Sequence, residues 1–96
     1  EPILNNEISK NISSLNIYPN PVLENTNLSF ELNNSNTISV IVYNINGSVV
    51  KTLYNNVMFN NGYHTLPVST SELPIGTYLI TLSSGDEMKV TKFIKY

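Results

Sequence analysis

Apolar and polar residues alternate in short runs over most of this 96-residue chain, and this pattern restricts the fold more than any other feature. Over residues 26–32, Leu28, Phe30 and Leu32 fall on one side of an extended backbone and the residues between them on the other. The runs are rich in Val, Ile, Thr, Tyr and Phe, which pack well on a pleated sheet. The sequence therefore predicts an all-β fold.

One run is apolar on both of its faces. Ile38, Val40 and Val42 are predicted to point into the core, and Ile41 and Tyr43 make the opposite face apolar as well. A strand of this kind is expected inside a sheet, where neighbouring strands cover both of its edges. We therefore predict that this run is the central strand.

Turn-forming residues separate the runs. Asparagine side chains tolerate a left-handed backbone, so the asparagine pairs at residues 33–34, 55–56 and 60–61 are expected in loops. Asn46-Gly47 predicts a type I′ hairpin turn, because both residues accept a positive φ. Strands are expected over residues 15–18, 26–32, 38–45, 48–54, 63–68, 76–82 and 87–96.

Strands at this spacing predict the architecture. About seven short strands separated by turns at intervals of roughly 8–12 residues indicate an immunoglobulin-like sandwich, with a small barrel as the alternative. We expect residues 15–96 to form this domain and residues 1–14 to be a linker from an upstream cargo region. Leu4, Ile8 and Ile12 have helical spacing, but no cap supports a helix. Because the chain does not begin with methionine, it is expected to derive from a longer precursor.

Composition excludes several classes of function. The formal charge is −2, with five lysines and no arginine, so no basic surface is available to neutralise nucleic-acid phosphates. The absence of cysteine excludes disulfides, thiolate catalysis and Cys-ligated zinc. No apolar run approaches the roughly 20 residues of a transmembrane helix. We therefore expect neither a nucleic-acid partner nor a transmembrane segment.

Side chains that support catalysis are scarce. His64 is the only histidine and Asp86 the only aspartate, whereas serine-type catalysis needs a hydroxyl, a histidine and a carboxylate together. His64 is in phase with Leu66 and Val68, and no second metal ligand lies at a suitable spacing. Asp86-Glu87 lacks the further oxygen ligands of a calcium loop. The sequence predicts no enzyme activity and no catalytic, cofactor or metal site.

Three tyrosines support an alternative function. Tyr43 and Tyr63 fall on the predicted solvent side of their strands and, with Tyr54, could stack against sugar rings. This arrangement is typical of carbohydrate-binding or adhesive β-sandwich modules of secreted enzymes. The same residues also suit contact with a neighbouring domain or an ordinary strand surface, and a structural spacer domain is a further alternative.

Four motifs in a fixed order carry a family resemblance. Together they resemble the type A C-terminal sorting domain of the type IX secretion system (Por secretion system) of Bacteroidetes, over about residues 15–96. The four landmarks are Tyr18-Pro19-Asn20-Pro21-Val22, Tyr43-Asn44-Ile45-Asn46-Gly47, Leu73-Pro74-Ile75-Gly76-Thr77-Tyr78 and Thr91-Lys92-Phe93-Ile94-Lys95. The positions that match the family pattern are Pro19, Asn20, Pro21, Gly47, Gly76, Tyr78, Lys92 and Lys95. Asn44 and Ser48 depart from it, because the family often has aspartate and a basic residue there.

The resemblance implies how the domain works. It implies an immunoglobulin-like sandwich fused behind an N-terminal cargo domain. It also implies recognition in the periplasm by the type IX outer-membrane translocon and its shuttle protein, and cleavage upstream of the domain by a sortase-like peptidase. The cargo would then reach the cell surface or the medium. No cofactor is implied.

The last predicted strand is the expected recognition element. It carries three lysines and ends at a carboxylate, so at a sheet edge its backbone could be captured by a receptor. Its lysines also suit protection of the edge against aggregation. The candidate translocon-recognition residues are Lys89, Lys92, Phe93, Ile94, Lys95 and Tyr96. Structural roles are also expected for the family-motif residues Pro19, Asn20, Pro21, Gly47, Gly76 and Tyr78.

Overall fold

The computed structural model describes residues 11–96, and all regular secondary structure in this range is β-strand. The seven strands are β1 (Ile12–Tyr18), β2 (Asn25–Leu32), β3 (Asn36–Asn44), β4 (Val49–Phe59), β5 (Gly62–Ser69), β6 (Gly76–Ser84) and β7 (Glu87–Lys95). Each overlaps one predicted strand, so the all-β prediction is confirmed. Residues 11–96 contain no helix with the length and apolarity to span a membrane.

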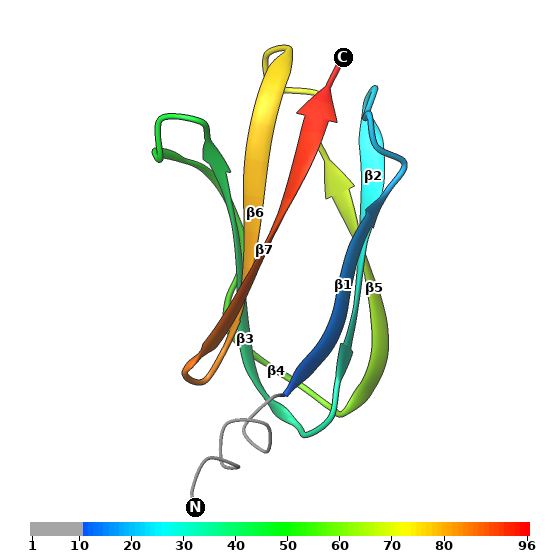
Figure 1. Cartoon of the computed structure of the whole chain (residues 1–96), viewed down its shortest axis with the longest axis vertical. Helices are drawn as coiled ribbons and strands as arrows, with labels where there is room; N and C mark the ends of the chain where they lie inside the picture. The colour runs from blue at the N-terminus through cyan, green and yellow to red at the C-terminus, as the bar shows by residue number, and fades with distance from the viewer. Residues whose placement is uncertain (1–10) are drawn as a thin grey trace, which may run out of the picture.

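The strands form two antiparallel sheets that face each other (Figure 1). One sheet has the order β1-β2-β5 and the other the order β4-β3-β6-β7. The chain changes sheet between β2 and β3, between β4 and β5, and between β5 and β6. This arrangement confirms the predicted sandwich, and it places β3 inside its sheet as the two-sided apolar run predicts.

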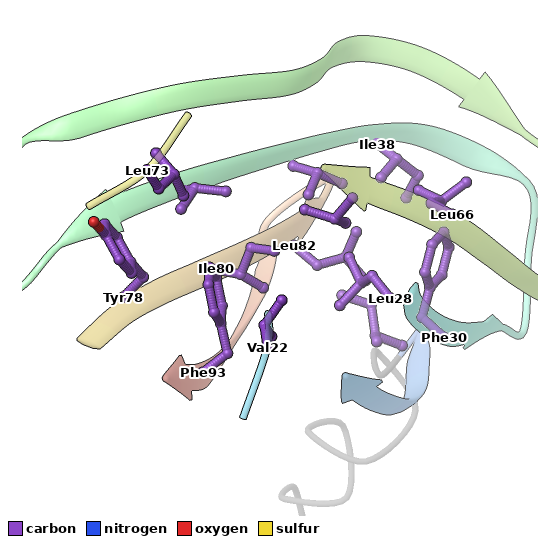
Figure 2. Packing of buried hydrophobic residues seen from close by; sticks show 14 of the residues in the cluster. Val22, Leu28, Phe30, Ile38, Leu66, Leu73, Tyr78, Ile80, Leu82 and Phe93 are labelled. Carbon is purple, nitrogen blue, oxygen red and sulfur yellow. The ribbon is translucent and has the colours of Figure 1, made fainter. Parts of the chain in front are cut away.

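The core lies between the two sheets and is built by alternation along the strands. On β2, the side chains of Leu28, Phe30 and Leu32 are at most 1% exposed, as the sequence predicts. Figure 2 shows side chains from both sheets meeting in this layer. The buried apolar residues are Ile12, Val22, Leu28, Phe30, Leu32, Ile38, Val40, Val42, Leu66, Val68, Leu73, Tyr78, Ile80, Leu82 and Phe93.

Strand β4 continues through a segment that the sequence predicts to be a loop. Asn56 has a φ of 55°, and the pairing with β3 shifts between Ile38 and Val40, so Asn55-Asn56 forms a bulge inside the strand. The Asn56 amide donates to Ser39 Oγ at 3.0 Å, which supplies a partner for the displaced backbone. The loop prediction is therefore wrong here, because the left-handed backbone that asparagine tolerates is accommodated as a bulge.

Strand β1 begins three residues before the predicted start of the domain. Ile12 is 1% exposed and belongs to the core. The backbone amides of Asn11 and Ile12 both donate to the Glu87 carboxylate, and Asn11 Nδ2 donates to Ser84 Oγ at 2.9 Å. These bonds join β1 to the β6–β7 hairpin and give Glu87 a structural role. Residues 1–10 of the expected linker lie outside the described residues.

Candidate functional site

The four landmarks, far apart in the sequence, lie at one end of the sandwich. Successive strands run in opposite directions, so the β1–β2, β3–β4 and β5–β6 connections and the end of β7 meet there (Figure 1). A hydrogen bond from the Thr70 amide to Glu24 O, at 2.8 Å, ties two of these connections together. We call this region the landmark end. Strand β1 starts at the opposite end, where the chain enters the domain.

The Pro19–Val22 motif pairs with the outer edge of β7. The Val22 amide donates to Ile94 O at 2.7 Å, and the Tyr96 amide donates to Val22 O at 2.8 Å. These bonds form an isolated parallel bridge between Val22 and Lys95. Val22 is fully buried, so its side chain fixes this short segment against the core.

The side chain of Asn20 extends the pairing along β7. Its Nδ2 donates to Lys92 O at 3.1 Å, and its Oδ1 accepts from the Ile94 amide at 3.0 Å. The side-chain amide thus bonds the strand edge as a backbone peptide group would. β7 is an edge strand, as predicted. Near residues 92–96, however, its outer backbone groups are already bonded to the Pro19–Val22 motif.

Exposed apolar side chains surround this junction. A groove of about 690 Å³ is lined by Pro19, Pro21, Leu23, Glu24, Asn25 and Tyr96, and so touches both segments of the junction. Leu23 is 70% exposed and Tyr96 is 62% exposed. The landmark end therefore presents apolar surface beside the end of β7.

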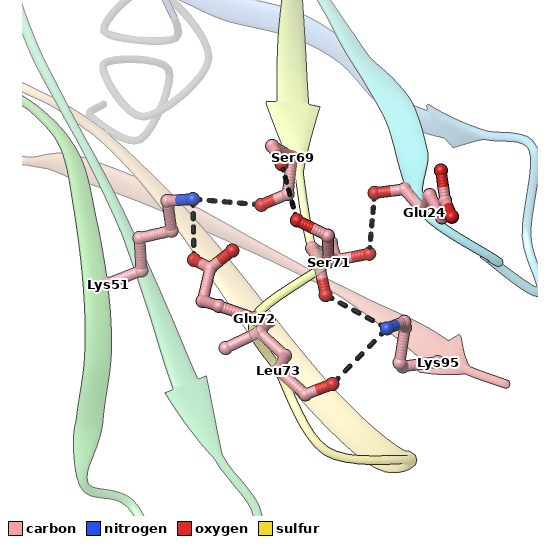
Figure 3. A network of polar contacts seen from close by, with 8 residues as sticks. Glu24, Lys51, Ser69, Ser71, Glu72, Leu73 and Lys95 are labelled. Atoms are coloured by element: carbon pink, nitrogen blue, oxygen red, sulfur yellow. Dashed lines mark hydrogen bonds and ion pairs between the residues drawn. The ribbon is translucent and has the colours of Figure 1, made fainter.

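Lys95 points into the protein, although the sequence places it among the recognition residues. The residue is 6% exposed, and its Nζ donates to Thr70 O at 2.9 Å and Leu73 O at 3.2 Å (Figure 3). The ammonium group thus holds the crossover between β5 and β6. The inward direction of the Lys95 side chain could have been predicted from the alternation along the strand, because Lys95 is two residues after the apolar Phe93 and shares its face.

A second lysine holds the same crossover from the other side. Lys51 Nζ of β4 donates to Glu72 Oε2 at 2.7 Å and to Ser69 O at 2.8 Å (Figure 3). The hydrogen bond from Lys51 lowers the pKa of the Glu72 carboxyl below its usual value. Because the carboxylate is exposed, this pair adds little stability, but it helps to fix the crossover.

Phe93 and Tyr78 form part of the core at the landmark end. Phe93 is fully buried and stacks on the Tyr78 ring, with centroids 5.4 Å apart and an angle of 20° between planes. Tyr78 Oη donates to Pro74 O at 2.6 Å, which satisfies the hydroxyl of this buried ring. Tyr78, which follows Gly76 in β6, thus has the structural role expected from its motif. Phe93 has the same role and is not available at the surface.

The remaining candidates on β7 differ in exposure. Lys92 is exposed, Ile94 is 39% exposed and Tyr96 is 62% exposed, all on the outside of the sandwich. Lys89 is half-buried. The structure therefore leaves Lys92, Ile94 and Tyr96 as the side chains of this segment that a partner can contact directly.

The β3–β4 connection is a hairpin, as predicted, but the turn type is different. Gly47 has a φ of 88°, whereas Asn46 has no positive φ, so a type I′ turn is excluded. The Gly47 amide donates to Asn44 O, and the Asn44 amide donates to Ser48 O, both at 3.0 Å. Asn44 Oδ1 also accepts from the amides of Asn46 and Ser48, at 2.9 and 3.0 Å. This side chain stabilises a three-residue loop in place of the two-residue turn.

Replacing Asn44 with alanine is expected to lower the free energy of unfolding by about 1–2 kcal/mol, because two backbone amides lose their acceptor. Asn44→Asp keeps an acceptor oxygen and is expected to change stability by less than about 0.5 kcal/mol. Urea unfolding followed by circular dichroism measures both. Equal losses of unfolding free energy in Asn44→Ala and Asn44→Asp would contradict the acceptor role of the side-chain oxygen. The same role explains why asparagine can replace the aspartate typical of this position, since both side chains carry this oxygen.

His64 has a structural environment. Its Nε2 lies 2.7 Å from Asn60 O, and its ring packs at 5.4 Å from Phe30 and 5.1 Å from Phe59. Across residues 11–96 no cluster of His, Asp or Glu side chains has a geometry that could hold a metal ion. The His64 ring is thus held by packing against two phenylalanines and by a contact with a backbone carbonyl.

The three tyrosines of the carbohydrate-binding alternative do not form one platform. Tyr43 pairs with Val49 near the landmark end, whereas Tyr63 lies at the start of β5 at the opposite end and in the other sheet. Tyr54 packs edge-on against Phe59 at 5.5 Å. Because the rings are dispersed, the structure gives this alternative no assembled sugar-binding surface.

Fold and site together define a small β-sandwich domain whose distinctive residues meet at one end. The chain matches the family described as "Secretion system C-terminal sorting domain" over residues 16–96 and belongs to it. This confirms the resemblance that the four landmarks indicate. A search of curated proteins found no match.

Proposed function

We propose that this domain is the sorting signal of a fused N-terminal cargo and directs that cargo through the type IX secretion system to the cell surface or medium. The domain itself catalyses no reaction. The observation that carries the proposal is the meeting of the four landmarks of a sorting-domain sequence at one end. That end lies opposite the point where the chain enters, so a cargo fused upstream leaves it accessible.

The partner in this proposal is the outer-membrane translocon with its shuttle protein, which meets the domain in the periplasm. The exposed side chains of Lys92, Ile94 and Tyr96, next to the apolar groove, supply a contact surface with a charged and an aromatic anchor. A sortase-like peptidase then cuts upstream of β1. Lys89 contributes at most a peripheral contact, because it is half-buried and distant from the landmark end.

The test is export of a reporter that carries an N-terminal signal for the periplasm and the whole chain at its C-terminus. In a type IX-competent cell the reporter is expected at the surface or in the medium, whereas a strain without the system retains it. The double substitution Lys92→Ala/Tyr96→Ala is expected to lower export about tenfold, since it removes two exposed anchors.

Tyr63→Ala is the matched control, because Tyr63 is 77% exposed but lies at the opposite end. It is expected to leave export unchanged. Equal export with and without the secretion system would refute the proposed function. Equal loss from the control and the double variant would refute its placement at the landmark end.

A further inference from the structure

We infer that the recognised element is a folded, two-part element in which Asn20 positions residues 92–96, and not the sequence of residues 92–96 alone. This inference rests on the proposed function. It assigns to Asn20 the part of a positioning residue, which acts through the strand that it holds.

The backbone contacts support this assignment. Beyond its pairing with β6, the last part of β7 is held by the Val22 bonds to Ile94 and Tyr96 and by the two Asn20 side-chain bonds. The main-chain amide of Tyr96 donates to Val22 O, outside the β6 pairing, which extends only to Lys95. The position of Tyr96 therefore depends on the Pro19–Val22 motif.

Side-chain directions explain why folding matters for recognition. Phe93 is fully buried and Lys95 is 6% exposed, so both are hidden in the folded domain. Lys92, Ile94 and Tyr96 are presented outward at alternate positions. In an unfolded segment all five side chains would be accessible, but their relative positions would not be fixed. In the folded domain only Lys92, Ile94 and Tyr96 are accessible, and the strand fixes their relative positions.

Holding this segment before binding also favours recognition. A partner that binds a fixed strand does not need to order it, so less of the binding free energy is lost to conformational entropy. The groove supports a joint recognition surface, because its lining combines Pro19, Pro21 and Leu23 from one segment with Tyr96 from the other. Disturbing Asn20 is thus expected to weaken recognition even where the fold persists.

The test compares Asn20→Ala with Asn11→Ala in the full chain fused to the reporter. Asn11 is a matched control at the opposite end, since its side chain also links distant segments, by bonds to Ser84 Oγ and the Asn34 amide. Melting temperature and amide hydrogen exchange at Ile94 and Tyr96 are measured on the purified chain. Asn20→Asp is a second variant, which keeps the acceptor for Ile94 but removes the donor to Lys92 O.

Both Asn20 variants are expected to fold. Asn20→Ala is expected to exchange the Ile94 and Tyr96 amides faster and to lower export about tenfold, as loss of roughly 1.4 kcal/mol of binding would. Asn20→Asp, which keeps the acceptor for the Ile94 amide, is expected to show a smaller change in both exchange and export. Asn11→Ala is expected to export normally despite a larger loss of melting temperature, because the Asn11 side chain is buried and that of Asn20 is exposed. The inference would be overturned if an Asn20 variant with faster amide exchange were exported as well as the unaltered chain. It would also be overturned if Asn11→Ala lost as much export as the Asn20 variants. If the unaltered chain is not exported, the proposed function fails first, and the inference with it.

Discussion

Phe93→Ala is expected to lower the free energy of unfolding by about 3–5 kcal/mol, the range for removing a fully buried aromatic ring. Phe93 is 0% exposed and stacks on Tyr78, so the truncation leaves a cavity between the sheets at the landmark end. Folded domains of this size are stable by only about 5–15 kcal/mol. The variant is therefore expected to be partly unfolded at physiological temperature, which urea or thermal unfolding followed by circular dichroism measures.

Ile94→Ala is the control for this prediction. Ile94 is the next residue of β7, but it faces outward and is 39% exposed, so its truncation is expected to cost less than about 1 kcal/mol. Similar losses for the two variants would contradict the burial of Phe93. If Phe93→Ala also lowers export, its large loss of stability attributes that defect to unfolding of the domain. Export defects of variants at the surface residues of β7 would instead arise without such a loss of stability.

The strand pattern was predictable because burial on one face of a sheet imposes a period of two on the sequence. Leu28, Phe30 and Leu32 illustrate this, and all three are buried as expected. The local form of the backbone was less predictable. An Asn-Asn pair can take a left-handed conformation in a loop or in a bulge, and only the pairing partner decides between them, as at Asn56.

The predicted site was incomplete for a different reason. The contacts of Asn20 and Val22 with β7 join residues more than 70 positions apart, and no local propensity encodes such a pairing. The proline-rich loop contains two adjacent apolar residues, and its sequence does not indicate that Val22 is the buried anchor and Leu23 the exposed neighbour. The lysines of β7 were predicted as one group, yet the alternation that places Phe93 in the core also turns Lys95 inward and Lys92 outward.

Lys95→Met is expected to lower the free energy of unfolding by about 1–3 kcal/mol, because the buried carbonyl of Leu73 loses its donor and that of Thr70 keeps only the bond from the Leu73 amide. Methionine keeps most of the aliphatic volume, so the change isolates the ammonium group from the packing of its stem. Urea unfolding gives the magnitude, and faster amide exchange at Leu73 is expected, because its amide bonds to Thr70 O within the same crossover.

Lys92→Met is the matched control, because Lys92 lies three residues earlier on β7 and is exposed. It is expected to change stability by less than about 0.5 kcal/mol. In the reporter assay the two variants are therefore expected to lose export for different reasons: Lys95→Met through the crossover and the fold, and Lys92→Met through the proposed direct contact with the partner. A stable Lys95→Met variant that still loses export would contradict the structural role of Lys95. It would instead require Lys95 to leave its buried site during recognition.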